Sequence, residues 1–166
     1  MLFLGLDPIF HCMNSLQENK TFTIAIANDH GGYALKKFLM EKRPDINWID
    51  LGCEGTDSVD YPDYAYKLAQ EMKNNAQIDF GVVICGSGLG VSYAANRYAH
   101  IRSAPCTNTT LARLARIDNN ANVLALGERV IGQLTALDVF DTFITTKFEA
   151  GGRHERRVNK LSEKGE

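Results

Sequence analysis

From Thr21 onward, short apolar runs alternate with segments of helical spacing, and this alternation restricts the fold more than any other feature of the chain. Between the runs, apolar residues recur every three or four positions, the period of an amphipathic helix. Strands that alternate with helices form right-handed βαβ units around a parallel sheet. We therefore predict a parallel sheet covered by helices on both faces, with five strands at residues 22–27, 46–51, 80–85, 101–106 and 122–126.

Length and composition are those of an ordinary globular protein. The chain has 166 residues, of which 45% are hydrophobic and 23% charged, enough apolar material for one core. Residues 1–20 lack a basic start, and Asp7 and Pro8 interrupt their apolar stretch, so we do not expect a signal peptide. We expect residues 1–20 to form an extension peripheral to function, whose order stays open, and residues 21–161 to form a single domain.

Charge and cysteine spacing argue against several function classes. The formal net charge of −2 gives no support for a nucleic-acid or anionic-membrane partner, because both favour basic surfaces. No apolar run approaches the length of a membrane span. The four cysteines contain no CxxC pair, so the spacing of metal ligands is absent. Without a secretory signal, we expect reduced thiols and a cytoplasmic location.

Residues 80–96, FGVVICGSGLGVSYAAN, carry the most specific chemical signal. A strand ends at Cys85, and the glycine loop Gly86-Ser87-Gly88-Leu89-Gly90 leads into a helix. Free N–H groups at such a turn bind anions and would stabilise a thiolate. The alternative is a buried packing cysteine, which is our interpretation of Cys53 and Cys106. The loop has neither GxGxxG spacing nor a P-loop lysine, so an oxyanion on a small substrate fits better than a nucleotide.

Polar residues follow other predicted strands at the same edge of the sheet, where ligands of parallel sheets bind. This rule brings residues 28–32 and 105–108 towards the Cys85 loop. Asp29 and His30 could bind hydroxyls and a phosphate, or Asp29 could cap a helix. Tyr61 precedes a proline, so we expect it to be extended and able to reach the crevice.

Cationic candidates gather towards the C-terminus. Arg153 and Arg157 are four residues apart and share one face of a predicted helix. Two guanidinium groups on one face suit a phosphate dianion, and Arg129 is a third candidate. The alternative is a solvated basic helix, which we favour for Arg156. His154 could join a phosphate site or lie exposed.

In combination these motifs resemble those of ribose-5-phosphate isomerase of the B type. The resemblance runs in order from about residue 22 to residue 161, through DHGG (29–32), DYPDY (60–64), ICGSGLG (84–90), AAN (94–96), NVLALG (122–127) and GGRH (151–154). It implies a Rossmann-like three-layer α/β/α sandwich that works as a homodimer with shared active sites, in some members a tetramer. It also implies interconversion of D-ribose 5-phosphate and D-ribulose 5-phosphate without a metal or organic cofactor.

The resemblance assigns a role to each candidate residue. Cys85 is the base that moves a proton between C1 and C2, and Ser87 assists proton transfer at the oxygens. The backbone amides of residues 86–90, Gly86, Gly88, Leu89 and Gly90 among them, hold the enediolate. The arginines are expected to reach across the dimer interface. The remaining side chains fall into two groups. The sugar is contacted by Asp29, Tyr61 and Asn119, and the phosphate is bound by His30, Arg129, Arg153 and Arg157.

One position departs from the family pattern. The family usually has a histidine where this chain has Asp118, and that histidine is assigned to opening the furanose ring. A carboxylate could still take the proton of the anomeric hydroxyl, but it is ordinarily a weaker base than imidazole. Ring opening is then slower, or another group performs it, or the substrate differs. The alternatives are therefore an isomerase of another sugar phosphate, such as a tetrose 4-phosphate or a hexose 6-phosphate, and a non-catalytic sugar-phosphate-binding module.

Overall fold

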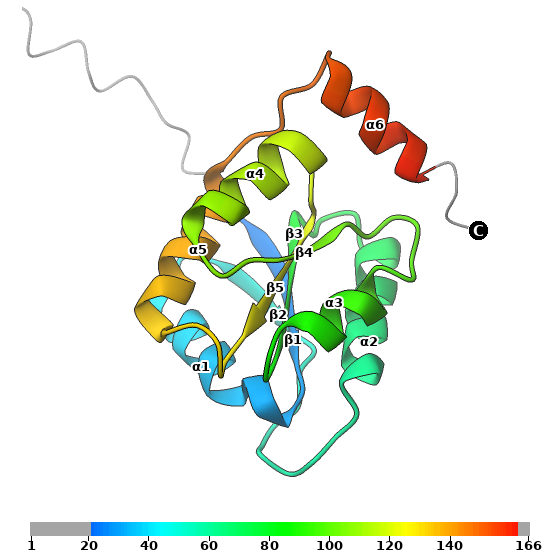
Figure 1. Ribbon diagram of the computed structural model, residues 1–166. Helices are drawn as coiled ribbons and strands as arrows, with labels where there is room; N and C mark the ends of the chain where they lie inside the picture. Colours follow the sequence, from blue (N-terminus) through cyan, green and yellow to red (C-terminus); the bar gives the residue numbers. More distant parts are fainter. Residues whose placement is uncertain (1–20, 163–166) are drawn as a thin grey trace, which may run out of the picture.

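The computed structural model describes residues 21–162, so the expected N-terminal extension lies outside the described residues. Its five strands pair in parallel in the order β2-β1-β3-β5-β4 (Figure 1). The predicted fold class, a five-stranded parallel sheet with a helical layer on each face, is confirmed. The strands are β1 (Thr23–Asn28), β2 (Asn47–Asp50), β3 (Phe80–Cys85), β4 (Ser103–Pro105) and β5 (Val123–Gly127).

Helices cover both faces of the sheet (Figure 1). One face carries α1 (Tyr33–Lys42), α4 (Thr109–Asn119) and α5 (Gln133–Thr145), and the other carries α2 (Tyr61–Asn74) and α3 (Leu89–Ala95). The short 3-10 helix η2 (His30–Gly32) follows β1, and α6 (Arg153–Ser162) packs on α4 at the end of the chain. Within residues 21–162, no helix combines the length and apolarity needed to cross a bilayer.

The strands differ in length according to their place in the sheet. β3 and β5 lie in its centre, and β5 is buried at every residue because helices cover both of its faces. The edge strand β4 has only three residues, although six were predicted. Ile101, which was assigned to this strand, instead donates its N–H to Tyr98 O in the turn after α3. An edge strand has one partner, so its ladder can end sooner than the apolar run does.

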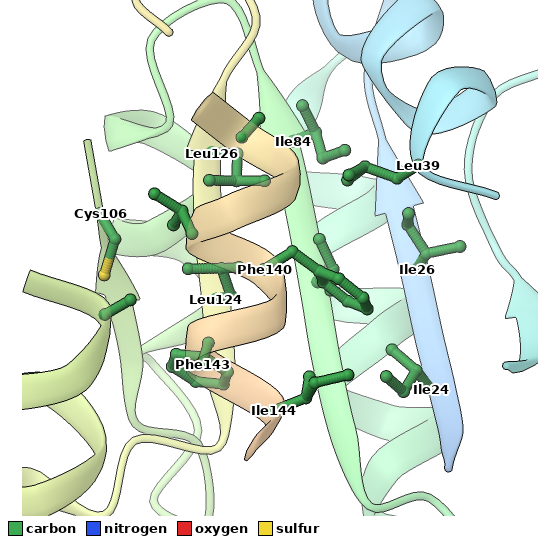
Figure 2. Close-up of a cluster of buried hydrophobic side chains, with 14 of the residues drawn as sticks. Ile24, Ile26, Leu39, Ile84, Cys106, Leu124, Leu126, Phe140, Phe143 and Ile144 are labelled. Atoms are coloured by element: carbon green, nitrogen blue, oxygen red, sulfur yellow. The ribbon is translucent and has the colours of Figure 1, made fainter. Parts of the chain in front are cut away.

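The core under α5 combines aliphatic and aromatic side chains. Ala136, Val139, Phe140, Phe143 and Ile144 follow the helical period and are all buried. The ring of Phe140 stacks on Trp48 with centroids 5.5 Å apart, and Phe143 meets Phe80 edge-on at 5.7 Å. Figure 2 shows the labelled side chains of α5, Phe140, Phe143 and Ile144, facing the strand residues Ile24, Ile26, Ile84, Leu124 and Leu126.

The turn after β3 is held against the end of β5. A Cβ on Gly127 would lie 2.4 Å from the Ser87 carbonyl carbon, so this approach requires glycine. The neighbouring backbone is hydrogen-bonded, because Glu128 N–H donates to Cys85 O at 2.9 Å and Arg129 N–H donates to Gly86 O at 3.0 Å. The end of β5 thus sets the position of the turn that begins at Cys85.

The stacking of Phe140 predicts a large stability contribution. We expect Phe140→Ala to lower the free energy of unfolding by about 3–5 kcal/mol, because it removes a fully buried ring and leaves a cavity. Leu134→Ala on the same helix is the control, since Leu134 is 73% exposed and its loss should stay within about 0.5 kcal/mol. Equal losses in a urea titration would contradict this account of the core.

The contact between Gly127 and Ser87 predicts that a single methyl group displaces the turn. We expect Gly127→Ala to cost about 1–3 kcal/mol in the free energy of unfolding, because the backbone must shift to admit the new atom. Gly55→Ala is the matched control, since a Cβ there would meet no atom within 4 Å. A Gly127→Ala protein as stable as wild type in chemical denaturation would show that the turn is not fixed by this contact.

Candidate active site

The ends of β1 and β3 meet at the point where the order of strands changes direction. Asp29 N–H donates to Ile84 O at 3.2 Å, and a Cβ on Gly31 would lie 3.1 Å from Gly86 N. The loops after these two strands are therefore in contact. This is the edge at which open parallel sheets form their ligand crevice. The predicted meeting of residues 28–32 with the Cys85 loop is confirmed by this geometry.

Cys85 ends β3 with its side chain inside the glycine turn. The residue is 5% exposed, and its Sγ accepts a hydrogen bond from Gly88 N–H at 3.1 Å. Gly88 has a φ of +78°, a conformation that glycine adopts without strain and that other residues rarely do. Leu89 N–H donates to the hydroxyl of the exposed Ser87 at 3.3 Å. The turn thus holds a sulfur atom against a backbone N–H donor, followed at once by the first residue of α3.

The other two cysteines of the described part have different surroundings. Burial raises the pKa of the Cys106 thiol to about 12, so this thiol is protonated at neutral pH. Cys53 Sγ donates to Gly55 O at 3.2 Å and accepts from Asn28 Nδ2 at 3.3 Å. Both arrangements agree with the packing role predicted for these residues.

Asp29 and His30 lie beside the glycine turn. Asp29 is 7% exposed and caps η2 by accepting from Gly31 N–H through Oδ1 at 2.9 Å, so the capping role considered for it is present. His30 Nδ1 accepts the N–H of Val59 at 3.2 Å. In a neutral ring this bond places the proton on Nε2, which is then a hydrogen-bond donor.

Tyr61 and Arg129 complete this group. A Cβ on Gly90 would lie 2.9 Å from the Tyr61 ring, and a Cβ on Gly86 would lie 3.4 Å from the Arg129 guanidinium carbon. Tyr61 is 40% exposed. The prediction that Tyr61 is extended is wrong, because it is the first residue of α2. The preference of a residue before proline for extended backbone is a bias that the packing of the ring on the glycine turn can override.

These residues are called the turn cluster below: they are the residues 85–90 with Asp29, His30, Tyr61 and Arg129. The other predicted site residues are not with them. We call Asp118, Asn119, Arg153 and Arg157 the helix cluster. They lie at the end of α4 and on α6.

The helix cluster lies at the other end of the strands, where their amino ends are. Helix α4 starts after the carboxyl end of β4 and runs back to the start of β5, so Asp118 and Asn119 are at the amino edge. Helix α6 packs on α4 beyond that edge, far from η2 and the start of α3 (Figure 1). Arg153 and Arg157 are exposed there. Within one protomer, the predicted site is therefore divided in two.

A cavity of about 490 Å³ lies beside the helix cluster, lined by the segment between α3 and β4, by Asn119 and by Leu161 of α6. Arg97, Tyr98 and Arg102 also line it, and none of the three was predicted as a site residue. Burial lowers the pKa of Arg102, whose Nε donates to Asn120 O at 2.8 Å. Isolated residues such as these belong to no motif, so their place beside the cavity could be found only from the fold.

Known proteins resemble this chain over nearly its whole described length. A Bacillus subtilis protein named only provisionally as a sugar phosphate isomerase is 42% identical over 84% of this chain and 95% of its own. Ribose-5-phosphate isomerase B of Escherichia coli is 38% identical over 84% of this chain and 93% of its own.

Solved structures of the same kind of enzyme are also similar to this chain in fold and sequence. Ribose-5-phosphate isomerase B of Clostridium thermocellum has a TM-score of 0.81 and 49% identity, covering 86% of this chain and 96% of that one. The Thermotoga maritima enzyme has a TM-score of 0.83 and 47% identity, covering 87% and 99%. The ribose/galactose isomerase family matches residues 24–161. The resemblance inferred from the motifs is confirmed, and the chain belongs to the ribose/galactose isomerase family.

Proposed function

We propose that the protein is a sugar phosphate isomerase that interconverts D-ribose 5-phosphate and D-ribulose 5-phosphate through an enediolate. The observation that carries the proposal is the Cys85 side chain inside the glycine turn, with its sulfur 3.1 Å from Gly88 N. A protein that only binds sugar phosphate needs no base at this position. Membership of the ribose/galactose isomerase family and the names of the relatives support the same chemistry.

The chemistry proposed for the turn cluster is a proton transfer between neighbouring carbons. The Cys85 thiolate takes the proton from C2 of the open aldose, and the electron pair moves into the C1–C2 bond while O1 becomes negative. Backbone N–H groups of residues 86–90 stabilise that charge, because they are already oriented by the turn. O1 gains a proton and O2 loses one with the help of Ser87, and Cys85 returns its proton to C1.

Substrate binding is assigned to the side chains around the turn. Asp29 and Tyr61 are proposed to bind sugar hydroxyls. His30 is suited to the phosphate, because its Nε2–H is the donor left after Nδ1 accepts from Val59. Arg129 lies against Gly86 and adds a guanidinium charge to the same end of the substrate.

The helix cluster can join this site only from a second copy of the chain. Arg153, Arg157 and Asn119 lie across the sheet from Cys85, so one protomer leaves the phosphate site incomplete. Large apolar side chains stand exposed on the intervening helices, with Tyr93 63% exposed and Leu111 43% exposed. We therefore propose a homodimer in which each site combines the turn cluster of one protomer with the helix cluster of its partner.

A tetrose 4-phosphate is the second candidate substrate, and Asp118 is the observation that favours it. A four-carbon sugar phosphorylated at O4 cannot close a furanose ring, so it needs no ring-opening group. A carboxylate in place of an imidazole is then no disadvantage. Turnover assays with four-, five- and six-carbon aldose phosphates distinguish these substrates.

The assignment of Cys85 predicts loss of proton exchange without loss of binding. We expect Cys85→Ala to slow the exchange of the C2 proton of ribose 5-phosphate with solvent by about 100-fold or more, because no other group at the turn replaces the base. Calorimetry should still detect ribose 5-phosphate binding. Cys106→Ala is the control, since that thiol is equally buried but stays protonated. If wild type binds the sugar and exchanges no proton, the protein is a binding module.

The shared site predicts complementation between two impaired proteins. Cys85→Ala should lose turnover, and the Arg153→Ala/Arg157→Ala double variant should raise KM because phosphate binding is lost. When the two are unfolded together and refolded, half of the dimers are mixed and each carries one intact site, so activity at a substrate concentration well below the KM of the double variant should return to about a quarter of wild type. Failure of the mixture to regain activity would contradict a site built from two protomers.

A further inference from the structure

We propose that His154 is the catalytic residue that opens the furanose ring of the substrate, with Asp118 as its positioning residue. This inference rests on the proposed function, because only a cyclic aldose phosphate needs such a step. It concerns a histidine whose role the sequence left open between phosphate binding and simple exposure.

The geometry places this imidazole inside the helix cluster. His154 Nε2 lies 3.8 Å from Asp118 Oδ1 and 3.2 Å from Arg153 Nε, which donates to it. The side chains of His154 and Asp118 are 22% and 38% exposed, so they are packed together but reachable from solvent. Residues that would enter the partner's site as phosphate ligands therefore bring an imidazole and a carboxylate with them.

Ring opening requires one proton to leave and another to arrive. The anomeric O1–H gives its proton to a base, the C1–O4 bond breaks as the C1=O bond forms, and O4 takes up a proton. A neutral imidazole can accept the first proton and return it to O4. A carboxylate could pass the proton in the same way, but it is ordinarily a weaker base than imidazole, so His154 is better suited than Asp118 to take the anomeric proton.

The other histidines of the described part are committed elsewhere. His30 Nδ1 accepts from Val59 N–H in the turn cluster. His100 Nε2 lies 2.8 Å from Ala69 O, on the α2 side of the molecule. Only His154 lies in the helix cluster, among the residues that the proposed dimer brings to the sugar.

The two partners of His154 favour different tautomers of its ring. The bond from Arg153 requires an unprotonated Nε2, whereas pairing with Asp118 requires a protonated Nε2. When a substrate phosphate binds the Arg153 guanidinium, Arg153 no longer donates to His154. Nε2 can then carry the proton and donate it to Asp118. Nδ1 is then free to accept the proton of the anomeric hydroxyl. Phosphate binding thus prepares the ring for its role.

The test compares a cyclic with an acyclic substrate. Ribose 5-phosphate is mostly a furanose, whereas ribulose 5-phosphate cannot close a furanose because its O5 is phosphorylated. We expect His154→Gln to lower turnover of ribose 5-phosphate by about 100-fold. The same variant should keep solvent deuterium exchange at C1 of ribulose 5-phosphate, followed by NMR, within about twofold of wild type. Asp118→Asn should show the same selectivity with a smaller loss.

The control and the contrary outcomes separate this inference from the proposed function. Arg156→Ala changes an exposed side chain of the same helix and should leave both rates unchanged. If His154→Gln lowers both rates equally, or leaves turnover of ribose 5-phosphate unchanged, His154 does not open the ring although the enzyme is an isomerase. A wild-type protein inactive on both sugars would overturn the proposed function, and this inference with it.

Discussion

The close approach of Gly127 to Ser87 is the constraint on which the site depends. Because no side chain separates the end of β5 from the turn after β3, the backbone of residues 128–129 can hydrogen-bond to Cys85 and Gly86. That contact holds the turn in the conformation in which Gly88 N–H points at the Cys85 sulfur. A preorganised donor costs no reorganisation when charge develops, so rigidity here serves the proposed chemistry directly.

The separation of the two clusters follows from the direction in which the chain runs along its strands and helices. Every helix of a parallel sheet returns the chain from the carboxyl edge to the amino edge, so residues at the end of α4 cannot lie beside residues at the end of β3. Arg153 and Arg157 continue beyond that same edge on α6. A site that needs both clusters must therefore be built by two chains, which makes association part of the proposed catalysis.

The pairing of Asp118 with His154 changes how the departure at position 118 is interpreted. Considered alone, a carboxylate suggested a weaker base or a different substrate. With an imidazole 3.8 Å away, the same carboxylate becomes a group that can orient and polarise another. In this view the ring-opening function is proposed to lie on the helix that also carries the phosphate ligands, so that binding and ring opening are coupled.

The sequence by itself determined the order of the elements, because hydrophobic periodicity reports which faces are buried; the bounds of β3 and the glycine turn after it were predicted correctly. It could not report the short β4, the helical Tyr61 or the burial of Lys36, whose ammonium meets Asp50 and Cys53 O at 3.0 Å. Periodicity is local, whereas these features depend on which strands become edges and which partners meet a charge. Only the tertiary structure decided that the predicted site residues form two groups at opposite ends of the sheet, because that distance is set by chain direction and not by spacing along the chain.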